Sequence, residues 1–257
     1  MSDLEASESG ENSLELAILG SGSAFSAIGH NASYLLGGEL LLDCGAPVTR
    51  LLGERNRPLD QVRSIAISHL HSDHFFHLPQ LLSARTVRYP EAEPLRIIGP
   101  PGTTKALDTL GRLAQGNHFW EYVRELGRPV VEDWVAGQSG NLGQFQVEAV
   151  AVEHSTVLSC FAFRVSGRGV VFGYSGDTTL CPGIRQLAAS VDYLLCECTS
   201  MTEPAPIHLW RGEVEELMQA SPATRFILTH LIGRAPVKGA LLASDGLVLR
   251  LRPVARG

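Results

Sequence analysis

Nine consecutive residues, 69–77, read His-Leu-His-Ser-Asp-His-Phe-Phe-His and constrain this chain more than any other feature. The apolar, β-prone run 62–68 comes directly before them and predicts a buried strand. His69 and His71 are two positions apart, so at the end of an extended segment their side chains point the same way. The Asp-His pair that follows lies in a turn leading toward a helix. Imidazole and carboxylate without thiolate suit zinc, manganese or iron better than a purely structural zinc site.

The alternative interpretation of this run is a polar surface loop that is rich in histidine by chance. Three histidines and a carboxylate converging from one loop would be a costly cluster of polar and charged groups without a cation between them. The sequence therefore predicts a metal site, and short motifs of this kind need further ligands elsewhere in the chain to support them.

Three further candidate ligands each follow a predicted strand. His154 ends the alternating run 146–152, Asp177 follows 169–174, and His230 follows 226–228. Loops at strand ends are where a rigid sheet presents functional side chains. Each of these residues alone would be an ordinary polar loop residue. Together with the first loop they predict one shared site.

Length and composition predict an ordinary globular protein. We expect residues 1–12, which are acidic and rich in serine, to be disordered, and residues 13–257 to form one large domain. The content of 44% hydrophobic and 19% charged residues is typical of soluble proteins. A net charge of −6 gives no general attraction to nucleic acid or to anionic membranes, so strong nucleic-acid binding is not expected.

The location that the sequence predicts is the cytoplasm. The first residues lack the apolar core of a signal peptide, and no apolar run approaches the ~20 residues of a membrane span. Five cysteines are an odd number without the spacing of a small disulfide scaffold, which indicates buried, reduced thiols. The predicted strands come in runs with helices between them, which favours two sheets covered by outer helices but does not separate this from other mixed α/β layouts.

The motifs resemble those of the metallo-β-lactamase-fold hydrolases, whose signature His-x-His-x-Asp-His after a strand is complete here. The resemblance runs from about Leu14 to the end of the chain. The ribonuclease Z-like branch is the most similar, on the strength of Leu-Gly-Ser-Gly-Ser-Ala at 19–24, Ser-Gly-Asp-Thr at 175–178 and Glu-Cys-Thr at 197–199. The resemblance implies an αββα sandwich (α/β class), two mixed sheets with outer helices, with the metal loops along one edge.

Carried over position by position, the resemblance implies two divalent metal ions, most readily zinc, with manganese or iron as alternatives. Two sets of ligands and one bridging carboxylate would hold them. The first ion would be bound by His69, His71 and His154, the second by Asp73, His74 and His230, and Asp177 would bridge the two. Two such ions can share a hydroxide and stabilise charge on a phosphoryl oxygen.

The same resemblance implies a proton donor for the leaving group. The candidate catalytic residues are Asp73, Glu197 and His208, with Glu197 supporting His208 as general acid near neutral pH. The alternative for His208 is a surface histidine before a helix. Asp43 either orients a ligand from outside the metal shell or simply ends a strand. His77 departs from the small residue usual in the family, and we expect it to cap a helix or to lie behind the ligands.

One departure from the ribonuclease Z-like pattern concerns the substrate. His154 and Asp177 are only 23 residues apart, and the predicted hairpin between them leaves no room for the long arm that grips transfer RNA in those enzymes. We therefore expect a phosphodiesterase acting on a small or nucleotide-type substrate. The alternatives are a hydrolase of thioesters, lactones, β-lactams or arylsulfates, and a non-catalytic ligand-binding regulator on the same fold. Homodimerisation is carried over from relatives by analogy alone.

Overall fold

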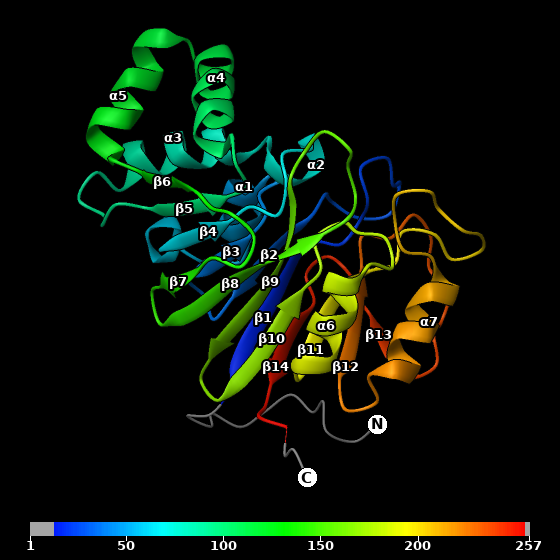
Figure 1. The fold of residues 1–257 in the computed structure, drawn as a ribbon. Helices are drawn as coiled ribbons and strands as arrows, with labels where there is room; N and C mark the ends of the chain where they lie inside the picture. Colours follow the sequence, from blue (N-terminus) through cyan, green and yellow to red (C-terminus); the bar gives the residue numbers. More distant parts are fainter. Residues whose placement is uncertain (1–12, 255–257) are drawn as a thin grey trace.

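Two mixed β-sheets pack face to face between outer helices in the computed structural model, which describes residues 13–254 (Figure 1). The predicted αββα arrangement is thus observed. The predicted disordered segment 1–12 lies outside the described residues, and the prediction of one domain over 13–257 stays a prediction. Among residues 13–254, no helix is long and apolar enough to cross a membrane.

The first sheet begins with antiparallel neighbours and continues with parallel ones. Strands β14, β1, β2 and β3 pair antiparallel, and β3, β4, β5 and β6 pair parallel. In sheet order the strands are β14 (Val248–Leu251), β1 (Leu14–Gly20), β2 (Ser33–Leu36), β3 (Leu40–Leu42), β4 (Ser64–Ala66), β5 (Arg96–Gly99) and β6 (Val130–Asp133).

The second sheet has the same plan. Strands β13, β12, β11 and β10 pair parallel, and β10, β9, β8 and β7 pair antiparallel. In sheet order they are β13 (Ala240–Leu242), β12 (Arg225–Thr229), β11 (Tyr193–Glu197), β10 (Val170–Tyr174), β9 (Cys160–Gly167), β8 (Phe145–Val152) and β7 (Ser139–Leu142).

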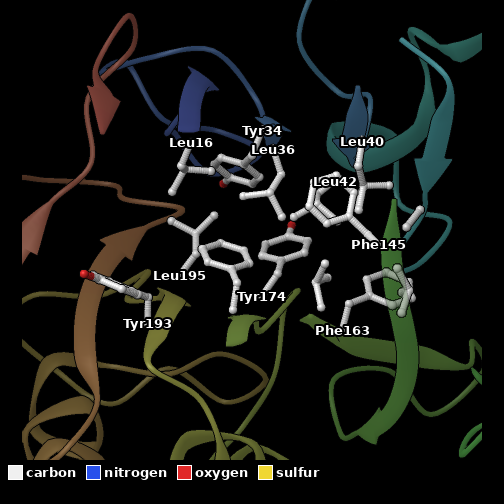
Figure 2. Packing of buried hydrophobic residues seen from close by; sticks show 14 of the residues in the cluster. Leu16, Tyr34, Leu36, Leu40, Leu42, Phe145, Phe163, Tyr174, Tyr193 and Leu195 are labelled. Atoms are coloured by element: carbon white, nitrogen blue, oxygen red, sulfur yellow. The ribbon is translucent and has the colours of Figure 1, made fainter. Parts of the chain in front are cut away.

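The core lies in three layers, which follow from the alternation of side chains along the strands. In β1, Leu16 and Ile18 face the central layer between the sheets, whereas Ala17 and Leu19 face the outer helices. The central layer is rich in leucine and aromatic side chains from both sheets (Figure 2). Because both faces of each sheet are covered, the central strands are mostly apolar.

Helices cover the two outer faces unequally. Those on the first sheet are α1 (Val48–Glu54), α3 (Leu78–Arg88), α4 (Thr103–Gln115) and α5 (Asn117–Gly127), and those on the second are α6 (Pro182–Ser190) and α7 (Arg211–Ala220). The short α2 (Ser72–Phe75) and the 3-10 turn η1 (Leu59–Gln61) lie in connections. Helices α4 and α5 project beyond the edge of the first sheet (Figure 1).

Three strands were not predicted from the sequence: β6, β7 and β13. Each is short and none is fully buried. The sequence Ser-Gly-Asn-Leu of β7 has turn chemistry, so the ladder to β8 overrides local preference there. The remaining predicted strands and helices are present with ends shifted by a few residues.

Candidate metal centre

The predicted ligands meet because their strands end at one edge of the sandwich. Strand β4 leads into the His-rich loop of the first sheet, and β8, β10 and β12 lead to His154, Asp177 and His230 in the second. Parallel neighbours bring their carboxyl ends to the same edge, which is where open α/β sheets present ligands. The structure brings together all seven predicted metal ligands.

Three histidines form the first cluster. Nδ1 of His71 lies 3.0 Å from Nε2 of His69 and 3.1 Å from Nε2 of His154. His69 and His154 are buried and His71 is half-buried. Burial lowers the pKa of both His69 and His71, which keeps their rings neutral and free to offer a lone pair.

Two aspartates and two histidines form the second cluster. Nε2 of His74 lies 3.3 Å from Oδ2 of both Asp73 and Asp177. Nε2 of His230 lies 3.2 Å from Oδ2 of Asp73 and 3.4 Å from Oδ2 of Asp177. All four side chains are buried.

Asp177 stands between the two clusters. Its Oδ2 atom is 3.8 Å from Nε2 of His69 and from Nε2 of His154, in addition to its contacts with the second cluster. Asp177 therefore lies where the family resemblance implies a bridging carboxylate.

Unpartnered atoms show that this donor set fits a cation. Within residues 13–254, Nε2 of His74 and Oδ1 of Asp177 are buried without a hydrogen-bond partner. Such groups are costly inside a protein unless something satisfies them. Nitrogen and oxygen donors converging without sulfur are those of a catalytic zinc, manganese or iron site.

The shifted pKa values of Asp177 and His74 also indicate that this site favours a cation. Burial alone would raise the pKa of Asp177, but His230 and His74 outweigh it and hold the pKa well below its usual range. Burial would lower the pKa of His74, but Asp177 and Asp43 raise it well above the usual range. The anionic surroundings thus favour positive charge at His74, and a divalent cation would supply that charge in place of the proton.

Asp43 orients His74, which decides between the two interpretations of this residue. Its Oδ2 atom accepts hydrogen bonds from Nδ1 of His74 at 2.7 Å, from the Ser68 hydroxyl at 2.7 Å and from the Tyr174 hydroxyl at 2.5 Å. With the Nδ1 proton so engaged, Nε2 of His74 presents its lone pair to the cluster. Asp43 is fully buried and adopts a left-handed φ of 57°, a strained conformation of the kind found at functional sites.

Two glycines permit this close packing. A Cβ on Gly45 would lie 1.6 Å from the carbonyl oxygen of Asp73. Gly176 has a φ of +56°, and a Cβ there would lie 2.6 Å from the carbonyl oxygen of Phe161. Gly176 directly precedes Asp177, so the turn that aims this carboxylate requires glycine.

Glu197 and His208 are paired as predicted. Oε1 of the fully buried Glu197 lies 3.1 Å from Nδ1 of His208, whose side chain is 20% exposed and so reachable from solvent. The His208 ring lies 4.7 Å from the ring of His154 and 5.3 Å from that of His230, centroid to centroid. Burial opposes charge on His208, but the hydrogen bond and the charge of Glu197 raise its pKa overall.

His77 and the aromatic residues of α5 lie outside the clusters. His77 is half-buried at the start of α3, where its side chain faces Gln80 at 3.3 Å and makes no helix cap. Trp120 of α5 is buried against α4, where its indole N–H donates to Asp108, so it has a packing role. Phe119 lines a surface cavity of about 540 Å³ with Phe76, beside the metal-binding loop.

Sequence reasoning did not single out three groups that contact ligand histidines. The Ser68 hydroxyl lies 3.0 Å from Nδ1 of His69, and the carbonyl oxygen of Ile207 lies 2.7 Å from Nδ1 of His154. The Thr199 hydroxyl lies 2.8 Å from Nδ1 of His230. Only Thr199 offered a signal, because it stands two positions after Glu197 and at a strand end would share its face.

A family model described as "Anti-Pycsar protein Apyc1" matches residues 14–232. Ribonuclease Z of Mycolicibacterium gilvum (strain PYR-GCK) is 28% identical over 243 residues, which cover 85% of this chain and 84% of that protein. Among solved structures, the metallo-β-lactamase-fold protein YhfI of Bacillus subtilis superposes with a TM-score of 0.76 at 19% identity, covering 93% of this chain and 99% of YhfI. The short form of human tRNase Z superposes with a TM-score of 0.73 at 24% identity, covering 91% of this chain and 98% of its own.

These comparisons confirm the predicted metallo-β-lactamase fold and the ribonuclease Z-like branch. The similarity to ribonuclease Z over 85% of the chain also confirms the predicted class of protein, a metal-dependent hydrolase of the phosphodiesterase type. The histidine–aspartate clusters provide the donors that such an enzyme requires.

Proposed function

The chain belongs to the Anti-Pycsar protein Apyc1 family, and we propose that it hydrolyses a small or nucleotide-type phosphodiester with two divalent metal ions. The observation that carries the proposal is the convergence of seven buried or half-buried side chains, Asp177 and six around it. Nε2 of His74 and Oδ1 of Asp177 have no hydrogen-bond partner within residues 13–254.

The two clusters would each hold one ion, most readily zinc. His69, His71 and His154 would bind the first, and Asp73, His74 and His230 the second, with Asp177 between them. Two ions held about 3.5–4 Å apart lower the pKa of a water molecule and stabilise negative charge on a phosphoryl oxygen. Asp43 and Thr199 keep Nε2 of their histidines turned toward the site.

His208 would donate the proton that the leaving oxygen needs. Its side chain reaches solvent, and its Nδ1 atom lies 3.1 Å from Glu197, so the opposite nitrogen, Nε2, is free to face a substrate. The raised pKa keeps a larger fraction of His208 protonated near neutral pH, which suits a general acid. Asp73, whose Oδ2 atom lies 3.3 Å from Nε2 of His74 and 3.2 Å from Nε2 of His230, would both bind metal and hold the attacking water.

Two observations support a small substrate. The whole interval between His154 and Asp177 is taken by strands β9 and β10 with their connections, so that no arm for gripping transfer RNA stands there. The net charge of −6 gives no long-range attraction to a polyanion. A small or cyclic phosphodiester places one phosphate at the metal centre and needs no extended basic surface.

The test is hydrolysis of bis(p-nitrophenyl) phosphate by metal-stripped protein reloaded with zinc or manganese, beside Asp177→Ala. We expect turnover in the wild type and none in the variant, since Asp177 contacts both clusters. Absence of turnover in a protein shown to contain two metal ions per chain would contradict the proposal and would favour thioesters, lactones or sulfate esters as substrates.

We further expect zinc as the resident metal, a cytoplasmic location and a homodimer. The donor set supports zinc but suits manganese and iron as well. Metal analysis of protein purified without added metal and sedimentation of the purified chain would test the first and last of these expectations.

A further inference from the structure

The buried carboxylate of Glu197 faces two histidines rather than one. Its Oε1 atom lies 3.1 Å from Nδ1 of His208 and also accepts the backbone N–H of Thr178 at 2.6 Å. Its Oε2 atom accepts the Thr199 hydroxyl at 2.6 Å, and that hydroxyl lies 2.8 Å from Nδ1 of His230. A short relay therefore joins the candidate acid to a candidate metal ligand.

The direction of this relay follows from the chemistry of its members. A threonine hydroxyl has a single proton, and a carboxylate can only accept. Since Thr199 gives its proton to Glu197, its oxygen must accept the proton of His230 Nδ1. That arrangement engages the Nδ1 proton of His230 with Thr199, so Nε2, which lies 3.2 Å from Asp73 and 3.4 Å from Asp177, is the nitrogen that would bind a metal ion.

We propose that Thr199 is a positioning residue through which the Glu197 carboxylate sets the orientation and tautomer of His230 while it also holds His208. The proposal deepens the proposed function, because it rests on the second cluster being a metal site. It assigns Glu197 a role in metal binding in addition to its role beside the acid.

The connection that bears His208 is fastened to both clusters. Thr199 lies at its start and contacts His230, and the carbonyl oxygen of Ile207, directly before His208, accepts from Nδ1 of His154. Residues 202–204, 206 and 207 of this connection are exposed. Nδ1 of His154 in the first cluster and Nδ1 of His230 in the second thus hold this connection in place.

The experiment compares zinc binding by four metal-stripped proteins: the wild type, Thr199→Val, Thr199→Ser and Thr178→Val. Valine keeps the volume of threonine but cannot take part in the relay, whereas serine keeps the hydroxyl. Thr178 is the matched control, because it is equally buried beside Glu197 but its hydroxyl bonds to the carbonyl oxygen of Thr179 and not to a histidine. A fifth protein, Thr199→Ala, replaces Thr199→Val in the comparison if valine prevents folding.

Zinc would be titrated against a chromophoric chelator, and urea unfolding of the metal-free proteins would check the fold. We expect the wild type to bind two ions, and Thr199→Val to keep one affinity and lose about 10–100-fold in the other, as loss of an outer-shell partner does elsewhere. Thr199→Ser and Thr178→Val should bind as the wild type does, and Thr199→Ala should follow Thr199→Val.

Two results would overturn the inference, and they differ from failure of the proposed function. Equal affinities for two ions in the wild type and in the Thr199→Val or Thr199→Ala protein would refute the role of Thr199 alone. An equal loss in Thr178→Val would show that any buried hydroxyl at this place matters and would refute the relay. A wild type that binds no zinc or manganese would remove the metal centre and the relay with it.

Discussion

Replacing Asp43 by asparagine tests whether the site depends on an oriented histidine. The side chain keeps its shape but loses its charge and one acceptor. In the native protein Oδ1 accepts the backbone N–H of Ser68 at 2.7 Å, and Oδ2 accepts from His74, Tyr174 and the Ser68 hydroxyl. In asparagine an NH2 group replaces one of these oxygens, so a donor would face either the Ser68 N–H or the other three donors without forming a hydrogen bond.

The magnitude follows from complete burial of both partners. Asp43 and His74 are each 0% exposed, so water cannot replace the lost acceptor. Removing one member of a buried, hydrogen-bonded charge pair typically costs about 3–5 kcal/mol of unfolding free energy. The metal affinity of the second cluster should fall about 10–100-fold, because His74 can then adopt the tautomer that carries its proton on Nε2.

The assay is urea unfolding of the metal-free Asp43→Asn protein followed by zinc titration. The control is Tyr174→Phe, which removes one of the four donors to Asp43 and leaves the His74 hydrogen bond in place. We expect a loss of about 1 kcal/mol in the control, the net worth of one hydrogen bond. An Asp43→Asn protein with wild-type stability and two wild-type zinc affinities would refute the reasoning.

Three further outcomes follow from the geometry. His208→Ala should retain two metal ions but lose about 10²–10⁴-fold in turnover of an alkyl phosphodiester, and much less with a p-nitrophenyl ester, whose leaving group needs little protonation; equal losses in kcat for both esters would contradict the acid role. The surroundings of Asp73 and Asp177 hold the pKa of both carboxyls below the value of about 4 that they have in the unfolded chain. This difference stabilises the folded protein above that pH, and the stabilisation is lost as the pH falls. The unfolding free energy of the metal-free protein should therefore fall between about pH 5 and pH 3, and less so in Asp177→Asn. Burial raises the pKa of Cys160 to about 11 and of Cys198 to about 12, so the native protein should react with a thiol reagent far more slowly than the urea-unfolded one, and rapid native reaction would show that the thiols are accessible.

The metal ligands could be predicted because each lies shortly after a strand that the sequence pattern marks. Alternating or apolar runs mark β8, β10 and β12, and polar residues directly after such runs stand at the edge of a sheet. His69 and His71 added the two-residue spacing that puts both side chains on one side. Local pattern therefore indicated which residues meet, although it did not indicate how the sheets would be ordered.

The partners behind the ligands could not be predicted in the same way. Tyr174 is 131 positions from Asp43, and Ile207 is 53 positions from His154 and contributes only its carbonyl oxygen. A backbone carbonyl is present in every residue, so the residue type gives no signal for it. A tyrosine inside an apolar strand is normally interpreted as a core residue. Strand β7 could not be predicted either, because its extended conformation comes from pairing with β8 and not from its own sequence.

The metal centre draws its ligands from both sheets, so the central core takes part in its geometry. His69 and His74 come from the first sheet, whereas His154, Asp177 and His230 come from the second.

Buried hydrogen bonds cross the interface directly beneath the site. The Tyr174 hydroxyl donates to Asp43, and the Tyr34 hydroxyl bonds that of Thr229 at 2.8 Å, with the two tyrosine rings 5.2 Å apart (Figure 2). Each cluster combines ligands from both sheets, and close-packed interiors transmit small displacements, so the separation of the sheets sets the distances between ligands within each cluster. The apolar layer of leucines and aromatics is therefore as much a determinant of the metal site as the polar residues above it.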